Sequence, residues 1–248
     1  MKEYSIEINC DVGEGIGNEA ELLPLISSCN IACGGHAGDI DTMTKVVRLA
    51  KKNGVRVGAH PSYPDRENFG RISMYISPES LIESIQSQLK FFTTILDKEQ
   101  VKMHHIKPHG ALYNDIAKNP DLAKTFLEAI GQYKDDVFLY VPYKSSIEIE
   151  SLKKNFTIKY EAFGDRNYNL DFTLVSRKHS KAVIENPEMV LSHLLSMIEK
   201  ESLRTVDGEL LKIKADTFCI HGDTSSALQI LTYLSEELPN RNISIIRE

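Results

Sequence analysis

The sequence lacks the paired cysteines that are typical of disulfide frameworks and redox-active thiols. It contains four cysteines and no CxxC pair, and each lies in or beside an apolar, strand-like run: Cys10, Cys29, Cys33 and Cys219. Cys29 and Cys33 would face the same side of one strand, at a separation too large for a disulfide. We therefore expect four small, buried, reduced side chains in a reducing compartment.

Long hydrophobic runs and a basic segment are also missing. No window approaches the roughly 20 apolar residues of a membrane-spanning helix, and MKEYSIEINCDVGEG lacks the pattern of a secretory signal. The net charge of −6 is spread along the chain, whereas phosphate backbones and anionic membranes select clusters of Lys and Arg. The one basic cluster, Arg177-Lys178-His179 with Lys181, is expected to be a solvated loop. These absences predict a cytoplasmic protein whose main partner is neither nucleic acid nor a membrane.

Two sequence signatures of catalysis are absent as well. The glycines of GEGIG (13–17) do not form GxGxxG, and no lysine followed by Ser or Thr completes a phosphate-binding loop. No serine lies in a GxSxG nucleophile elbow. Covalent catalysis is therefore disfavoured, and we expect at least part of any nucleotide site to lie on another chain.

What the sequence does contain is a repeated alternation of strand-like and helix-like segments. We predict strands, some running on into loops, at 4–9, 28–34, 55–60, 103–110, 137–142, 156–163, 215–223 and 243–248. We predict helices at 41–54, 77–96, 118–132, 144–153, 186–201 and 224–237, the first capped by Asp39 or Asp41 and the last by Asp223 or Thr224. Seven or eight such units in one domain (1–248) favour parallel strands closed into a (β/α) barrel, with an open doubly wound sheet as the alternative.

Polar and titratable residues concentrate where these strands end. The carboxyl ends of all strands of a parallel barrel open onto one face, and that face carries the site. We therefore expect the following residues to meet there: Asn9, Asp11, Gly13, Glu14, Asn30, His36, Asp39, His60, Tyr63, Asp65, Arg66, Lys107, His109, Tyr113, Glu161, Asp165, Arg166, His221 and Asp223. By contrast, we expect His104 to pack within a strand, and His179 and His193 to lie on the surface.

This group of residues supports two kinds of chemistry. Its imidazoles and carboxylates offer enough ligands for a divalent metal that activates water, with Asp11, His36 and His60 as one set. Without a local HxxxH spacing, hydrogen-bonded loop or core histidines remain the alternative. The cations Lys107, Arg66, Arg71 and Arg166 suit a small anionic substrate, although Lys107–Glu161 and Arg166–Asp165 could instead be structural ion pairs.

Six segments together resemble the LamB/YcsF family, in the family's order and over nearly the whole chain: NCDVGEG (9–15), NIACGGHAGD (30–39), GAHPSYPDRENFGR (58–71), KPHGALYN (107–114), EAFGDRNY (161–168) and CIHGD (219–223). The resemblance implies a (β/α)7 barrel of the glycoside hydrolase/deacetylase kind. It also implies a hydrolase activity, because characterised members are the A component of an ATP-dependent 5-oxoprolinase. That enzyme opens the lactam of 5-oxo-L-proline to L-glutamate, with ATP as co-substrate together with Mg²⁺ and with subunits B and C as partners.

The same resemblance implies roles for individual residues. It places Asp11, Lys107, His109, Glu161 and Arg166 in catalysis, and Glu14, His36, Asp39, His60, Arg71 and His221 in substrate binding. Gly35 and Gly164 stand where the family commonly has an aromatic residue and an alanine, so we expect a wider pocket wall. Two alternative functions remain, a stand-alone metal-dependent deacetylase or amidohydrolase and a non-catalytic substrate-binding subunit.

Overall fold

Seven parallel strands close into a barrel in the computed structural model, which describes residues 2–224 and 226–247. These strands are β1 (Tyr4–Val12), β2 (Ser28–Ala32), β3 (Arg56–His60), β4 (Met103–Ile106), β5 (Phe138–Pro142), β6 (Ile158–Phe163) and β9 (Thr217–Cys219). Closure comes from β9, which pairs with β6 through Phe163–Cys219 and with β1 through Asn9–Cys219. The predicted (β/α)7 barrel is thus confirmed and the open sheet is excluded.

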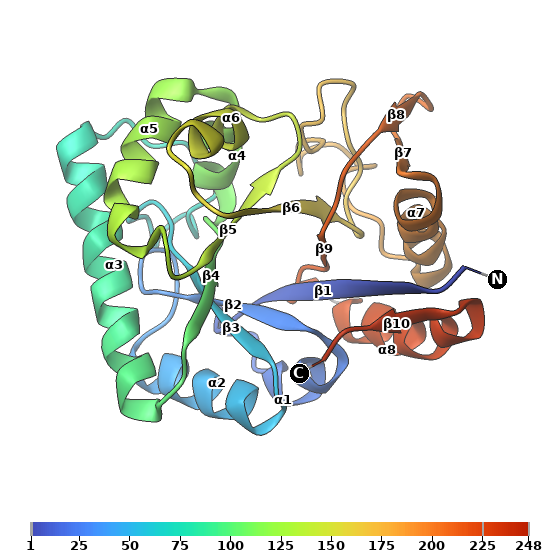
Figure 1. The fold of residues 1–248 in the computed structure, drawn as a ribbon, viewed down its shortest axis with the longest axis horizontal. Helices are drawn as coiled ribbons and strands as arrows, with labels where there is room; N and C mark the ends of the chain where they lie inside the picture. Colours follow the sequence, from blue (N-terminus) through green and yellow to red (C-terminus); the bar gives the residue numbers. More distant parts are fainter. Residues whose placement is uncertain (1, 225, 248) are drawn as a thin grey trace.

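Helices cover the outside of this barrel (Figure 1). They are α1 (Glu19–Leu22), α2 (Ile40–Lys52), α3 (Pro78–Glu99), α4 (Gly110–Lys118), α5 (Pro120–Ala129), α6 (Ser146–Lys153), α7 (Pro187–Lys200) and α8 (Ala227–Glu237). Helix α2 shows how the sequence specifies them. Its apolar positions Met43, Val46, Val47 and Ala50 are all buried, and the Asp39 side chain accepts a hydrogen bond from the Thr42 N–H at its N-terminus.

Some elements differ from the sequence prediction. The helix expected at 118–132 is α5, which begins at Pro120 because the Asn119 side chain caps it. Helix α4, which precedes it, was not predicted. Residues 202–204 and 210–212 form an unpredicted antiparallel hairpin, β7–β8. Helix α8 begins at Ala227 rather than near 224, and neither Asp223 nor Thr224 caps it. The last strand, β10 (Ile243–Ile245), pairs with the first residues of β1, next to the residues of β1 that pair with β9.

The interior of the barrel is polar along one line of side chains. His105 Nε2 lies 2.6 Å from Asn30 Oδ1, and the Asn30 amide donates to Asn9 Oδ1 at 2.7 Å. Asn9 in turn donates to Thr217 Oγ1 at 2.9 Å. The His105 ring occupies the space beside Gly58, its partner on β3, where a Cβ atom would lie 2.1 Å from His105 Nε2. Gly58 therefore makes room for a buried histidine that ties three strands together.

The four cysteines are all buried and free, as expected. Among the described residues, no helix combines the length and apolar character that crossing a membrane requires. His104 is half-buried on β4, where its ring contacts Phe138. His179 is exposed as predicted, but the expected surface position of His193 was wrong. The face of α7 that carries His193 is packed, and the ring contacts Tyr168.

We expect His193 to make stability sensitive to mild acid. Burial lowers its pKa to about 4, against about 6.5 for an unfolded histidine. As the pH falls below 6.5 the unfolded chain therefore binds a proton that the folded chain does not, so the free energy of unfolding falls until the pH reaches about 4. Between pH 7 and pH 5, the free energy of unfolding measured with urea should fall by about 2 kcal/mol less in His193→Gln than in the parent protein. The exposed His179→Gln should behave like the parent, and an equal loss in His193→Gln would contradict the assignment.

Candidate active site

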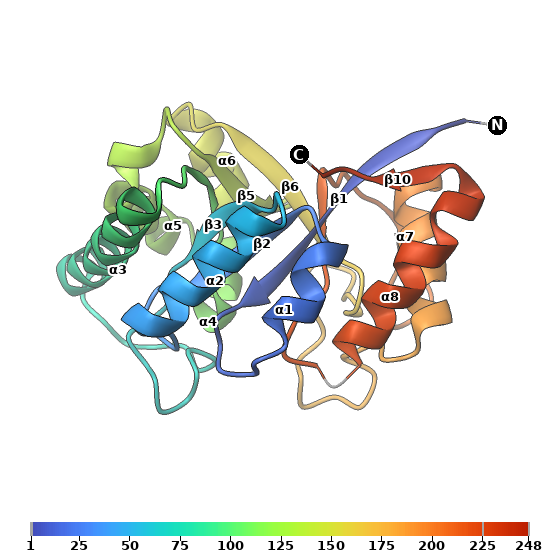
Figure 2. The same cartoon turned by 90° about the horizontal axis from the view of Figure 1, so that it is seen from below.

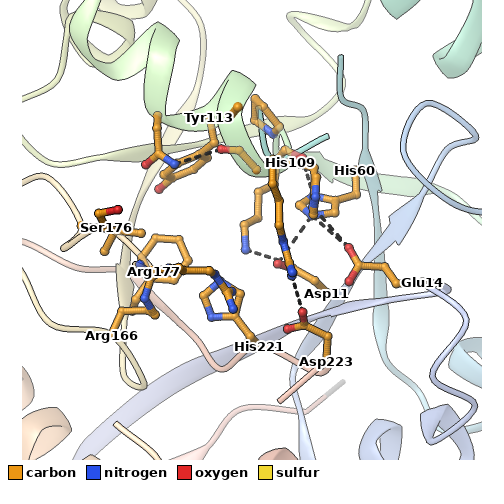
Figure 3. Close-up of a pocket in the computed structure, with 18 of the residues that line it drawn as sticks. Asp11, Glu14, His60, His109, Tyr113, Arg166, Ser176, Arg177, His221 and Asp223 are labelled. Atoms are coloured by element: carbon orange, nitrogen blue, oxygen red, sulfur yellow. Dashed lines mark hydrogen bonds and ion pairs between the residues drawn. The ribbon is translucent and has the colours of Figure 1, made fainter. Parts of the chain in front are cut away.

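A cavity of about 290 Å³ opens at the carboxyl ends of the barrel strands. The loops that follow several strands gather along the lower edge of the molecule in Figure 2. Glu14, His60 and His109 lie on one side of the cavity, and Arg166, Ser176 and Arg177 lie on the other (Figure 3). Ten predicted residues line it: Asp11, Glu14, His60, Arg71, Lys107, His109, Tyr113, Arg166, His221 and Asp223.

Lys107 is fixed at the floor of this cavity between two buried carboxylates. Its Nζ atom lies 2.8 Å from Asp11 Oδ1 and 3.0 Å from Glu161 Oε1. Burial lowers the pKa of Lys107, but the two carboxylates outweigh burial and hold that pKa well above its ordinary value. The Lys107–Glu161 ion pair left open by the sequence therefore exists. Because Asp11 and Glu161 balance its positive charge, Lys107 is not free to bind an anionic substrate. It is instead a charged hydrogen-bond donor held in a fixed position.

Asp11 connects the lysine to the barrel interior. Its Oδ1 accepts hydrogen bonds from Lys107 Nζ at 2.8 Å and from the Asn30 amide at 2.7 Å, while Oδ2 lies 3.5 Å from His60 Nε2. Burial raises the pKa of Asp11, but His60 and Lys107 lower it well below its usual range. Asp11 is thus an ionised carboxylate with one oxygen committed to Lys107 and the other turned towards His60.

Next to Asp11, one carboxylate and three imidazoles converge. Glu14 Oε1 lies 3.0 Å from His36 Nε2 and 3.2 Å from His109 Nδ1. His109 Nδ1 lies 3.0 Å from His60 Nε2, and the His109 and His36 rings stack with centroids 3.6 Å apart. Burial lowers the pKa of His36 to about 3 and also lowers that of His109. Despite burial, the neighbouring His109 and His36 side chains hold the pKa of Glu14 below its usual value. The carboxylate of Glu14 therefore lies beside two rings, His36 and His109, whose neutral form is favoured.

On the opposite wall, Asp165 orients His221. Both oxygens of the buried Asp165 carboxylate lie 3.0 Å from His221 Nδ1, and Oδ2 also accepts the His221 backbone N–H at 2.8 Å. A carboxylate can only accept, so His221 Nδ1 carries the proton and Nε2 is the basic nitrogen. This pair has the arrangement of a general base and its orienting carboxylate. Asp165 therefore pairs with His221 instead of Arg166.

Arg166 holds a loop over the cavity. Its guanidinium donates to the backbone oxygens of Val175 at 2.7 Å and Ala182 at 3.1 Å. The segment between these contacts places Ser176, Arg177 and Lys178 in the cavity lining. Arg177 and Lys178 are exposed, as the prediction of a solvated loop requires, and they also border the cavity. Their position in the loop after β6 is the signal that could have identified them, because that loop is one of those that must reach the strand-end face.

The other cations near the cavity are already engaged. Arg71 lines the cavity and pairs with Asp223, which is also a lining residue. Arg66 donates to the backbone oxygens of Gly34 and Gly38, so it braces the loop after β2. The side chains of Arg177 and Lys178, by contrast, form no ion pair within residues 2–224 and 226–247. These two are the cations available to an anionic substrate.

Of the residues to which the family resemblance gives roles, three lie outside the cavity lining. Asp39 is exposed and caps α2, so the expectation that it faces the pocket was wrong; its side chain satisfies the helix terminus instead. Glu161 is closed off behind Lys107, with a side chain that is 0% exposed. His36 lies behind His109 as part of the imidazole cluster. His105, by contrast, was missed by the sequence argument because it lies mid-strand and supports Asp11 only through Asn30.

The two glycines expected to widen the pocket do not do so. A Cβ atom on Gly35 would lie 2.4 Å from Ser62 Oγ and 2.5 Å from Gln88 Oε1, so Ser62 and Gln88 fill that space. A Cβ atom on Gly164 would lie 2.8 Å from Ile220 Cδ1. Both glycines lie outside the cavity lining. The expectation was wrong because neighbouring side chains compensate for the missing ones.

Comparisons with known proteins agree with this architecture. The LamB/YcsF family model matches residues 6–247. A lactam utilization protein from Thermus thermophilus is 32% identical, with a TM-score of 0.91 over 98% of this chain and 100% of that chain. A GH113 β-1,4-mannanase (12% identity, TM-score 0.51, 95% and 99% covered) shares the fold. So does the peptidoglycan deacetylase PdaC from Bacillus subtilis (9% identity, TM-score 0.50, 98% and 87% covered).

Proposed function

The chain belongs to the LamB/YcsF family, and we propose that it is the A component of an ATP-dependent 5-oxoprolinase. In this proposal the protein is cytoplasmic and acts as a hydrolase on a cyclic amide. The proposal rests on one observation: a basic histidine nitrogen lies on one side of a small cavity and positively charged side chains lie on the other. His221, oriented by Asp165, faces a rim that bears Arg166, Arg177 and Lys178. A small lactam with a carboxylate matches both the charge and the size of this cavity.

The proposed reaction begins with activation of the lactam carbonyl. An amide is resonance-stabilised, and transfer of the γ-phosphoryl group of ATP to the lactam oxygen produces ADP and a better electrophile. Water then adds to that carbon, the ring C–N bond breaks and the nitrogen takes up a proton. A second water releases phosphate from the resulting acyl phosphate, which leaves glutamate.

Individual side chains suit these steps. The basic Nε2 of His221 is placed to accept a proton from water and to return it to the departing nitrogen. The unpaired Arg177 and Lys178 suit the substrate carboxylate or the phosphoryl oxygens, and Arg166 holds the loop that carries them. Lys107 keeps Asp11 ionised and in place. Because the sequence has no complete phosphate-binding loop, we propose that subunits B and C supply part of the ATP site, with Mg²⁺ bound to the nucleotide.

The proposal is tested by glutamate release from 5-oxo-L-proline, with the purified chain alone and with subunits B and C from the same source. Release only in the full mixture and only with ATP is the expected result. Release by the chain alone, without ATP, would instead support a metal-dependent amidohydrolase, the second candidate, which the Glu14–imidazole cluster favours. Full activity of the assembled enzyme with His221→Ala would support a non-catalytic binding role.

Arg177 is expected to bind the substrate anion. A charge-assisted hydrogen bond contributes about 1.5–3 kcal/mol, so Arg177→Gln should raise KM for 5-oxoproline by about ten-fold or more with a smaller effect on kcat. Steady-state kinetics of the assembled enzyme would measure this change. Lys181→Gln is the matched control, since Lys181 is an exposed cation of the same loop outside the cavity lining. Equal KM values for the two variants would contradict the role of Arg177.

A further inference from the structure

We propose that Glu14, His36, His60 and His109 form a binding site for a divalent transition-metal ion of the zinc class. One ligand atom from each residue can be chosen so that all four lie within 4.8 Å of one another. Ligands at 2.0–2.2 Å from a tetrahedral zinc ion are about 3.4 Å apart. The separations of 3.0 Å between His36 Nε2 and Glu14 Oε1, and of 3.2 Å between His109 Nδ1 and Glu14 Oε1, lie close to that value.

Hydrogen bonds to the far side of two rings determine which nitrogens face the centre of the cluster as lone pairs. His60 Nδ1 lies 2.7 Å from the backbone oxygen of Lys107, and His109 Nε2 lies 2.9 Å from that of Phe69. A carbonyl oxygen can only accept, so both of these nitrogens carry hydrogen. In neutral rings, the remaining nitrogens, His60 Nε2 and His109 Nδ1, therefore present lone pairs to each other at 3.0 Å.

Two lone pairs at this distance, beside a carboxylate, repel unless a cation lies between them. Glu14 Oε1 is 3.2 Å from His109 Nδ1 and 3.9 Å from His60 Nε2, so it adds negative charge at the same point. A divalent ion would turn each of these repulsions into a ligand bond. The backbone oxygens of Lys107 and Phe69 would then be the outer-shell acceptors that orient metal-bound histidines and increase their basicity.

The backbone around Phe69 is shaped to hold the cluster. Phe69 has a left-handed φ of 55°, which is unfavourable for a residue with a side chain, and in this conformation its oxygen meets His109. At the next position, Gly70, a Cβ atom would lie 3.0 Å from the Cβ of His36 and 3.1 Å from His109 Cδ2. A side chain there would press on the stacked rings of His36 and His109, and the φ of +61° at Gly70 also favours glycine.

The donor set indicates the class of ion and separates this site from the sequence prediction. Imidazole-rich sets favour zinc and similar ions, whereas Mg²⁺ prefers oxygen ligands, so this site is distinct from the Mg²⁺ that accompanies ATP. Asp11, predicted as a ligand with His36 and His60, has one oxygen bound to Lys107 and Asn30. Glu14 and His109 complete the set instead. Since Glu14, His60 and His109 line the cavity, the ion would border bound substrate.

The test uses the untagged full chain and needs no substrate, so its outcome is independent of the proposed 5-oxoprolinase activity. The protein is stripped with a chelator and equilibrated with Zn²⁺, and free ion is removed by gel filtration before elemental analysis. Titration with Co²⁺, followed by its visible ligand-field bands, reports on the coordination. We expect about one zinc ion per chain and a Co²⁺ spectrum typical of four-coordinate nitrogen and oxygen ligands.

Variants then locate the ion. His60→Gln and His109→Gln should each weaken zinc binding by at least about 100-fold, while His179→Gln on the exposed loop should bind as the parent does. Circular dichroism would establish that each variant is folded. A zinc content of less than about one-tenth of an ion per chain in the parent protein would overturn the proposal. This measurement does not depend on whether the variants fold. Parent-like binding by folded His60→Gln and His109→Gln would also overturn it.

Discussion

Replacing Lys107 with methionine should abolish turnover and also destabilise the fold. Methionine retains much of the apolar stem but removes the ammonium group that lies between Asp11 and Glu161. Two carboxylates are then left buried without their cation, and breaking a buried ion pair in this way costs about 3–5 kcal/mol. The loss of activity follows from the catalytic role that the family resemblance implies for Lys107, whereas the loss of stability follows only from the two carboxylate contacts. Urea unfolding and glutamate release by the assembled enzyme would measure the two effects.

A second substitution separates these effects. Lys107→Met combined with Glu161→Gln removes one of the stranded charges, so it should recover a substantial part of the lost stability. It should not recover turnover, because Asp11 still lacks its partner in the cavity. A folded and active Lys107→Met protein would remove the lysine from the mechanism. Failure of the double variant to gain stability would contradict the charge argument.

Asp165→Asn should lower turnover by about 10²- to 10⁴-fold with little change in the fold. An asparagine oxygen can still accept a hydrogen bond, but the carboxylate that stabilises a protonated His221 is lost, and an amide NH₂ can select the other tautomer of the ring. The cavity would then be presented with an N–H group instead of a basic nitrogen. The kcat of the assembled enzyme measures the loss.

The comparison with His221→Gln makes this prediction specific. If Asp165 acts only through His221, each single variant and the double variant should lose a similar factor in kcat, because residues that act as a unit are not additive. The pH dependence of kcat should also change, since a purely structural defect would leave it unaltered. Losses that multiply in the double variant would show that Asp165 and His221 act separately.

The fold and the location of the site follow from local patterns in the sequence. Helix α2 was predicted from its apolar spacing and its cap, and strand-end positions placed residues as distant in sequence as Asp11 and His221 at one cavity. This works because parallel strands joined by helices bring all their carboxyl ends to the same face. The same rule failed for Asp39, which is the nearest oxygen to the free N–H groups of α2 and is used there.

Those local patterns could not predict which side chains interact with one another. Nothing in the sequence distinguishes Asp165 as the partner of His221 rather than of its neighbour Arg166, because that choice depends on closure of β9 against β6. Likewise, Arg177 reaches the cavity only because Arg166 holds its loop through two backbone oxygens.

Hydrophobic period, caps and turn residues act over a few neighbouring positions, so the amino-acid order was sufficient for the barrel, its helices and the face that bears the chemistry. Pairing across the barrel depends on distances of about 3 Å between atoms from different strands, where hydrogen bonds and ion pairs form. Such distances are settled only when the sheet closes and the core packs. The Lys107 ion pairs, the tautomers of His60 and His109 and the loss of Asp39 from the site therefore belong to the tertiary structure.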